Sequence, residues 1–228
     1  MRKHVLNIII LCGVLLNIGC NQPEPELEQE YLPILVNGNK WTYACRTYNE
    51  YGYKNDCTLI QSVCGDTIIN GTSYKIVKNT IEDLDIPNVL DVMGLPEKEY
   101  YREDNGKLSL YDKLPNGLAG DVLMFDLDLD EGQGVSHCHA VSSEIDSAKV
   151  LDAFYAKTTD NKYRKGLVIG LSDDSKNEYY YNDMWVEGIG SRCSGIRENT
   201  THTYGFRAML NDFSTQGKVV FEGNPKWE

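Results

Sequence analysis

Two Asn-Gly dipeptides, each set between runs of strand-forming residues, limit the folds open to this chain more than any other feature. Asn70-Gly71 lies between the runs 67–69 and 73–77, and a second pair at 105–106 lies between similar runs. A two-residue Asn-Gly loop in such a setting favours a type I′ turn, because both of its residues tolerate positive φ. The sequence therefore predicts two β-hairpins.

The same strand-and-turn pattern continues along the chain, with turn residues roughly every 8–12 positions. Further strands are expected at 40–48, 121–129, 163–171, 178–186, 202–210 and 217–222, whereas 141–156 fits either a short helix or a strand. The 15 tyrosines favour pleated, half-buried surfaces. About ten short strands with little helix predict a mostly β fold, either an antiparallel β-sandwich or an open β-barrel.

The N-terminus carries the parts of a secretory signal. A basic start at 2–4 precedes a mainly apolar run at 5–18, which is too short and too interrupted for a membrane span of about 20 residues. A cysteine after a glycine indicates that 1–19 is a lipoprotein signal peptide and that Cys20 becomes the lipid-bearing N-terminus. Asn17 stands where leucine is usual, so an ordinary secretory signal is the alternative.

The segment that follows Cys20 is expected to be a tether. Residues 21–34 contain repeated Pro and Glu and no basic residue, a composition that favours an extended, solvated chain. The range 20–34 is therefore interpreted as the lipidated cysteine and its acidic tether, and 35–228 as a single β-rich domain. Acidic residues at this place also resemble the surface-export signals of Bacteroidetes lipoproteins. Surface-exposed and periplasm-facing positions on the outer membrane both stay open.

The charge of the chain excludes some partners. The formal net charge is −12, whereas binding to nucleic acid by counterion release needs clustered Lys and Arg. Anionic lipid headgroups would repel so acidic a chain, so the membrane contact is expected to come from the acyl chains on Cys20.

The cysteines permit disulfides but do not fix their pairing. Five remain after Cys20, namely Cys45, Cys57, Cys64, Cys138 and Cys193. A secreted chain can form disulfides, and an odd number leaves at least one thiol outside any intrachain pair. Cys45 and Cys57 lie symmetrically about a predicted turn and could form a cross-hairpin bridge, although Cys64 competes for the same partner.

Several stretches resemble, by their joint order, a large group of uncharacterised secreted proteins and lipoproteins of the Bacteroidetes. They are N-G-N-K-W at 37–41, G-D-T-I-I-N-G-T-S-Y-K at 65–75, Y-Y-R-E-D-N-G-K at 100–107, L-M-F-D-L-D-L-D-E-G at 123–132, W-V-E-G-I-G-S at 185–191 and G-K-V-V-F at 217–221. The resemblance covers most of 35–222 and implies a β-rich domain outside the cytoplasm with no established activity. The chain departs from the group in its cysteines and in an insertion at 152–162.

The sequence predicts neither a metal site nor a cofactor. His137 and His139 would share one face of a strand and could reach one metal ion, but an exposed polar strand edge explains them better. Asp126, Asp128 and Asp130 have the spacing of the first ligands of a calcium loop. The glycine and the final glutamate that this loop requires are missing, and an amphipathic strand explains the spacing better.

No motif indicates catalysis, so the chain is not expected to be an enzyme. The C-x-x-C and G-x-S-x-G motifs are both absent. A hydrolase using Glu187 with Asp126 or Asp183 is the enzymatic alternative, because paired carboxylates across a cleft can cleave glycosides. Glu187 is more simply interpreted as an acceptor for backbone N–H groups of the glycine-rich turn that follows it.

A cluster of aromatic residues is the best candidate for a binding site. Tyr179, Tyr180, Tyr181 and Trp185 could stack on a sugar ring or a protein partner, although packing within the sheet is the alternative. The expected function is that of a lipid-anchored envelope lipoprotein that binds a glycan, a protein or a small ligand without catalysis. A carboxylate-dependent hydrolase and a structural or adhesion subunit of the envelope are the other hypotheses.

Overall fold

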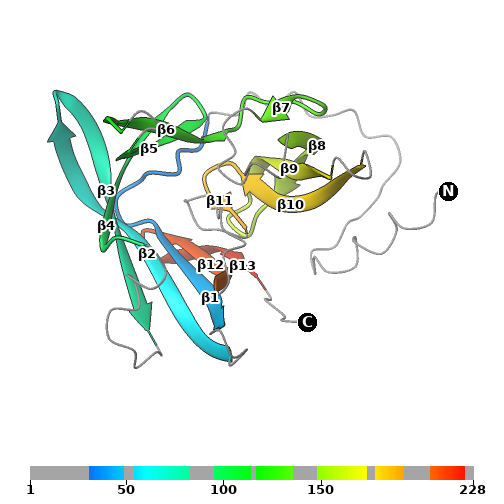
Figure 1. The fold of residues 1–228 in the computed structure, drawn as a ribbon. Coiled ribbons are helices and arrows are strands. Elements are labelled where there is room, and N and C mark those ends of the chain that lie inside the picture. Colours follow the sequence, from blue (N-terminus) through cyan, green and yellow to red (C-terminus); the bar gives the residue numbers. More distant parts are fainter. Residues whose placement is uncertain are drawn as a thin grey trace. The chain divides into compact units, whose positions relative to one another are not determined.

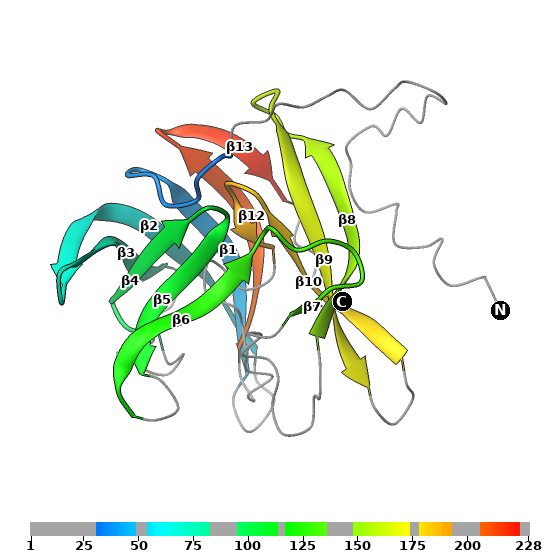
Figure 2. The same ribbon diagram turned by 90° about the horizontal axis from the view of Figure 1, so that it is seen from above.

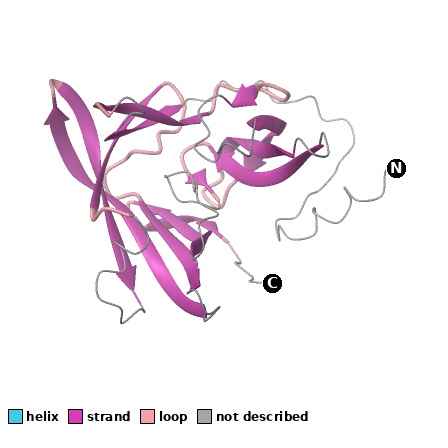
Figure 3. Cartoon of the chain, viewed as in Figure 1, coloured by secondary structure: helices cyan, strands magenta, loops and turns pink. Residues whose placement is uncertain are grey.

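The computed structural model describes residues 31–48, 54–82, 95–113, 117–135, 148–173, 178–192 and 206–223. Within these ranges every regular element is a β-strand and no helix occurs (Figures 1 and 3). Consequently no helix in the described part has the length and hydropathy of a membrane span. The predicted mostly β class is confirmed, because the described part is all β, with two antiparallel sheets that fit a sandwich or a barrel.

Eight strands form the larger antiparallel sheet, in the order β13-β12-β1-β2-β3-β4-β5-β6. They are β1 (Lys40–Tyr48), β2 (Lys54–Ile69), β3 (Thr72–Glu82), β4 (Lys98–Asp104), β5 (Lys107–Lys113), β6 (Ala119–Asp126), β12 (Phe206–Thr215) and β13 (Lys218–Glu222). The sheet curls into a half-barrel (Figure 2). Neighbouring strands are consecutive in the chain except at β1, which pairs with β12 and so joins the two ends of the domain.

Five strands form the smaller antiparallel sheet, in the order β11-β10-β9-β8-β7. They are β7 (Gly134–Val135), β8 (Ala148–Lys157), β9 (Tyr163–Asp173), β10 (Glu178–Val186) and β11 (Gly190–Ser191). The described part thus holds thirteen strands where the sequence predicts about ten. Two of them have only two residues each. In the range left open between helix and strand, the described residues 148–156 belong to β8.

Both Asn-Gly pairs form the predicted hairpins. The φ angles are 50° at Asn70 and 83° at Gly71, which join β2 to β3, and 46° at Asn105 and 79° at Gly106, which join β4 to β5. Positive φ at both central residues is the mark of a type I′ turn, whose twist matches that of the flanking strands. Local turn chemistry therefore sets the register of these two strand pairs.

The two sheets share one hydrophobic core. Its largest fully buried side chains are Trp41, Trp185, Tyr43, Tyr101, Phe125 and Phe213. The indole N–H of Trp41 on β1 donates to the carbonyl of Ile189, beside the smaller sheet. The ring of Phe125 on β6 meets that of Trp185 on β10 edge to face, with centroids 5.1 Å apart. The smaller sheet therefore packs against the inner face of the larger one.

The folded part begins by Tyr31, four residues before the predicted boundary at residue 35. One carboxylate of β4, Glu103, accepts the backbone N–H groups of Ile34 and Leu35, each at 2.8 Å, and the hydroxyl of Tyr31. Burial, with the nearby carboxylate of Glu103 as the next cause, raises the pKa of Tyr31 well above its usual value. The phenol therefore stays protonated and continues to donate.

Candidate functional site

The predicted aromatic cluster does not form an exposed surface at Trp185. This residue is 0% exposed, because its ring fills the space between the two sheets against Phe125. A ligand in solvent therefore has no access to the indole, which corrects the expectation that Trp185 stacks on a ligand. Tyr179, Tyr180 and Tyr181 lie on β10, and their side chains lie outside the described part.

The structure brings two of the predicted cysteines together. Cys45 on β1 lies directly opposite Cys57 on β2, and both are buried, whereas Cys64 is exposed. The pKa of the Cys45 thiol is raised, first by its hydrogen bond with Cys57 and then by burial. The geometry therefore favours Cys57 over Cys64 as the partner in a cross-hairpin bridge. Cys20, Cys138 and Cys193 lie outside the described residues.

Glu187, the first carboxylate of the hydrolase hypothesis, accepts hydrogen bonds from backbone N–H groups. Its Oε1 accepts the N–H of Leu32 at 2.9 Å and its Oε2 accepts that of Lys165 at 3.1 Å. The donors therefore come from the entering chain and from β9, not from the glycine-rich turn that follows Glu187. In this position the carboxylate ties the start of the domain to the smaller sheet.

The other two carboxylates also accept structural hydrogen bonds. Asp183 is buried and accepts the backbone N–H of Met184 at 2.7 Å and the hydroxyl of Ser191 at 2.5 Å. Asp126 accepts the N–H of Asp128 at 3.1 Å and pairs with the ammonium of Lys107, also at 3.1 Å. The turn at Asp126 ends β6 three residues before the predicted end of that strand.

None of the described residues forms a metal-binding cluster. No group of three or more His, Cys, Asp or Glu side chains there is placed to hold an ion. The predicted pair His137 and His139 lies outside the described ranges. Two of the three predicted aspartates pair instead with lysines, Asp126 with Lys107 and Asp130 with Lys165.

A surface that sequence analysis missed lies on the hairpin of β8 and β9. Tyr155 faces Lys165 across the two strands, and Lys157 faces Tyr163. Side chains two apart on a strand, and those directly opposite, share one face of the sheet. Each tyrosine therefore has one lysine two residues away on its own strand and another directly opposite on the neighbouring strand. This surface is named the Tyr–Lys patch and consists of Tyr155, Lys157, Tyr163 and Lys165.

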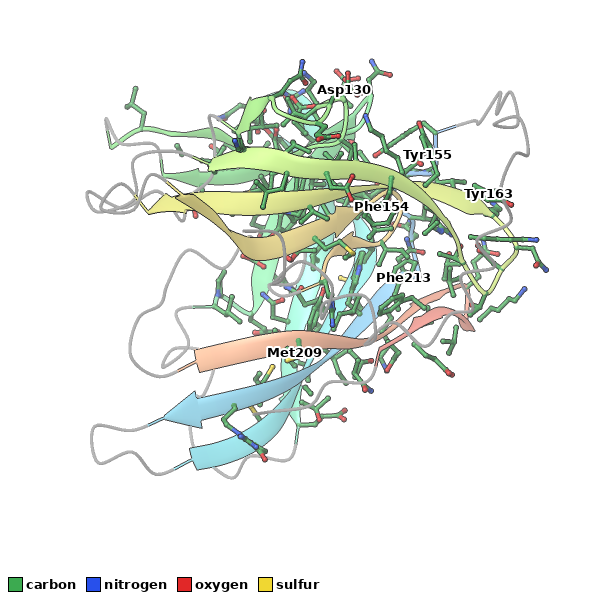
Figure 4. All side chains as sticks on the ribbon, turned by 90° about the vertical axis from the view of Figure 1, so that its right-hand side faces the viewer. Asp130, Phe154, Tyr155, Tyr163, Met209 and Phe213 are labelled. Carbon is green, nitrogen blue, oxygen red and sulfur yellow. The ribbon has the colours of Figure 1, made fainter. Side chains whose placement is uncertain are left out.

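The tyrosines of the Tyr–Lys patch are accessible to solvent. Tyr155 is 59% exposed and Tyr163 is 39% exposed, and Figure 4 shows both at the hairpin end of the smaller sheet, with Asp130 nearby. The ammonium of Lys157 lies 5.9 Å from the ring centroid of Tyr163, within the range of a cation–π contact. Exposed tyrosines combine a flat apolar face with a polar tip, as binding surfaces often do.

The local charge around the Tyr–Lys patch is opposite to that of the whole chain. Residues 148–168 contain five basic and two acidic side chains, although the chain carries −12 in total. One of these acids, Asp160, is bound to Arg164 at 2.7 Å. The carboxylate of Asp130 reaches the ammonium of Lys165 only at 3.5 Å and is itself largely exposed. The patch is therefore locally cationic.

A buried ion pair fixes the turn beside the Tyr–Lys patch. Arg164 donates to Thr158 at 2.9 Å, to Asp160 at 2.7 Å and to the carbonyl of Glu187 at 3.2 Å. Burial alone would raise the pKa of Asp160, but the Thr158 hydroxyl and the Arg164 guanidinium outweigh it and hold this pKa below its usual value. The hairpin is thus held in place before any ligand arrives, which reduces the entropic cost of binding.

The sequence contains a signal for this surface. Tyr-x-Lys occurs at 155–157 and again at 163–165, and antiparallel pairing places each tyrosine opposite a lysine. The signal becomes readable only when both stretches are known to be adjacent strands, and 152–162 was interpreted as an insertion.

The chain matches no protein-family model, no curated protein and no solved structure.

Proposed function

We propose that this chain is a lipid-anchored, non-catalytic binding protein of the bacterial cell envelope, and that the Tyr–Lys patch binds a carboxylate-bearing ligand. The observation that carries the proposal is the alternation of two exposed tyrosines with two lysines on one sheet face of an acidic chain. Each ammonium can pair with a carboxylate, and each ring offers a flat face to the apolar part of the same ligand.

The net charge of the chain does not prevent this interaction. At physiological ionic strength the Debye length is about 8 Å, so a bound carboxylate senses mainly the charges beside it. A single exposed ion pair contributes only about 0.2–1 kcal/mol. A useful affinity therefore requires several contacts at once, which favours a polymeric ligand over a small molecule.

The N-terminal sequence supports the location. A lipid on Cys20 would hold the domain at a membrane surface, where acidic polymers of the envelope come within reach. The resemblance to Bacteroidetes lipoproteins points in the same direction. Replacement of the cysteine (Cys20→Ser) is expected to abolish lipid labelling and to move the protein out of the membrane fraction.

The proposal is tested by titrating the full chain, in detergent micelles, with fluorescently labelled poly-L-glutamate and recording anisotropy. The double variant Lys157→Gln/Lys165→Gln should bind about tenfold more weakly, since two ion pairs of roughly 0.7 kcal/mol are lost. Lys78 and Lys98 supply a matched control, because they are exposed and directly paired on β3 and β4.

The control variant, Lys78→Gln/Lys98→Gln, makes the same change in net charge far from the Tyr–Lys patch and should leave the affinity within twofold of the wild type. Equal losses in the two double variants would show that attraction is diffuse and that the patch is not a site. Absence of binding by the wild-type chain would also overturn the proposal.

A further inference from the structure

Within the part of the chain that the structure describes, one edge of the smaller sheet is open beside the Tyr–Lys patch. On its other side β8 pairs with β9 along its length. At the open edge β7 reaches only Ala148 and Lys149, and Gly132 and Gln133 add two bonds to Val150. For 152–157 no described residue provides a hydrogen bond at this edge.

The open edge of β8 can pair with a further strand. In an antiparallel sheet, alternate residues of an edge strand direct their N–H and C=O groups outward. Natural edges are usually protected by proline, by inward-pointing charges or by bulges within the strand. Here the four central residues are A-F-Y-A, and the charged residues Asp152 and Lys157 stand only at the ends. The bulge in β8 precedes Asp152.

We infer that the edge of β8 at 152–157 binds an extended acidic segment of a partner protein, which adds to the smaller sheet as a further strand. This inference rests on the proposed function, because the Tyr–Lys patch lies on one face of the same edge. Main-chain hydrogen bonds supply affinity in strand addition, and alternate side chains supply specificity.

The two faces of β8 define the side-chain pattern of the partner. On one face, Tyr155 and Lys157 lie next to the added strand, and acidic residues there would meet the cationic patch. On the other face lie Asp152, Phe154 and Ala156. The exposed carboxylate of Asp152 disfavours acids on that face, whereas the half-buried ring of Phe154 favours apolar residues. The partner segment should therefore alternate acidic and apolar residues.

On the face that carries Phe154, the position of its ring is set by Gly166, its direct partner on β9. The ring of Phe154 lies over Gly166 so closely that a Cβ there would come within 2.4 Å of the ring. Because Gly166 has no side chain, the ring of Phe154 can pack directly against the backbone of β9. This packing forms an apolar surface next to the edge of β8.

A polysaccharide lacks the regular backbone donors and acceptors that the edge offers to match. An anionic sugar polymer would use only the Tyr–Lys patch, whereas a peptide uses the patch and the edge together. Blocking the backbone of a peptide without changing its side chains therefore separates the two modes of binding.

The test uses the full chain in detergent micelles and a fluorescein-labelled octapeptide of alternating glutamate and valine. Two further peptides carry N-methyl groups on all glutamates or on all valines, which blocks one backbone edge or the other. The unmodified peptide should bind, one methylated peptide should lose at least tenfold in affinity, and the other should stay within threefold. A peptide of the same composition with blocked order (four glutamates, then four valines) should bind at least fivefold more weakly.

Other outcomes overturn the inference in distinguishable ways. If both methylated peptides bind as well as the unmodified one, and Lys157→Gln weakens all three, strand addition is wrong and the proposed function stands. If only polygalacturonate binds, the ligand is a sugar polymer and the inference is again wrong. If neither polygalacturonate nor any peptide binds, the proposed function falls together with the inference.

Discussion

The two sheets of this protein treat their surface charges differently. The larger sheet pairs several of its charges internally, through Arg46–Asp56, Lys75–Asp66, Arg102–Asp121 and Lys107–Asp126. In the smaller sheet the short ion pair, Arg164–Asp160, is largely buried. Of the Tyr–Lys patch, Lys165 meets the carboxylate of Asp130 at 3.5 Å, and Lys157 lies over the ring of Tyr163. Lys78 and Lys98 are exposed on the larger sheet as well, so we propose the smaller sheet as the binding surface because its lysines alternate with exposed tyrosines.

The interiors differ as well. The larger sheet carries a buried polar chain across β2, β3 and β4, in which Gln61 donates to Asn79 at 2.9 Å and Asn79 donates to Glu99 at 3.0 Å. A slip of one residue in register would break these buried hydrogen bonds. The smaller sheet instead uses glycines, with Phe154 lying over Gly166. A polar chain thus helps to specify the register of β2, β3 and β4, whereas the shape of the Phe154–Gly166 contact helps to specify that of β8 and β9.

The largest expected effect separates the core of the smaller sheet from its surface. Replacement of Trp185 (Trp185→Ala) should lower the free energy of unfolding by about 3–5 kcal/mol, because a fully buried indole leaves a cavity. Replacement of Tyr155 (Tyr155→Ala) should change it by less than about 0.5 kcal/mol. Urea unfolding followed by circular dichroism gives both values, and similar losses in the two variants would contradict the assignment of core and surface.

A second comparison sets the buried ion pair against an exposed one. Arg164→Ala should destabilise the protein by roughly 3 kcal/mol, because it removes a buried guanidinium and leaves the largely buried Asp160 carboxylate without its partner. Arg102→Ala removes a more exposed pair with Asp121 and should cost less than about 1 kcal/mol. Thermal unfolding at pH 7 measures both. Equal shifts in the unfolding temperature of the two variants would show that the Arg164–Asp160 pair does not stabilise the β8–β9 turn more than an exposed pair would.

Oxidation should join β1 and β2 of the larger sheet covalently. With glutathione disulfide as oxidant, Cys45 and Cys57 should lose two protons and two electrons and form a cross-strand disulfide. Closing the loop of 13 residues from Cys45 to Cys57 should stabilise the protein by roughly 3 kcal/mol in the chain-entropy estimate. The reaction should be slow because the raised pKa of Cys45 keeps its thiol protonated.

Peptide mapping by mass spectrometry identifies the bridge, and Cys45→Ala serves as the control that cannot form it. A bridge between Cys57 and Cys64 in the wild-type protein would show that the register of β1 and β2 does not govern the pairing.

Acid should weaken the smaller sheet through Asp160. Because the pKa of Asp160 is lowered in the folded state, its ionised form contributes stability above its unfolded value of about 3.9. That contribution disappears as the pH falls through the folded pKa. The stability difference between the wild type and Asp160→Asn, measured by urea unfolding from pH 7 to pH 2, should therefore shrink below about pH 4. A constant difference across this range would contradict the role of the ion pair.

The smallest expected effect is a gain. Asp130→Asn removes the carboxylate that competes with a ligand for Lys165, and an exposed ion pair contributes about 0.2–1 kcal/mol. The affinity for poly-L-glutamate should rise about two- to threefold. A fall in affinity would indicate that Asp130 itself contacts the ligand, or that Lys165 does not.

The sequence predicts most of the fold and little of the candidate site. The hairpin at Asn70-Gly71 is predictable because its turn chemistry is local. Burial of Trp185 is not, since alternation separates the two faces of a strand without saying which face meets the core. The Tyr–Lys patch depends on the pairing of β8 with β9, and this pairing depends on packing. The location of the protein remains a prediction from the first 20 residues.

The most direct test of the central claim is hydrogen exchange of the full chain with and without the alternating glutamate–valine peptide. The account predicts that the outward amides of 152–157 exchange freely in the free protein and become protected in the complex, and that the larger sheet shows no change. Protection confined to the larger sheet, or a complex in which 148–168 exchanges as in the free protein, would contradict it.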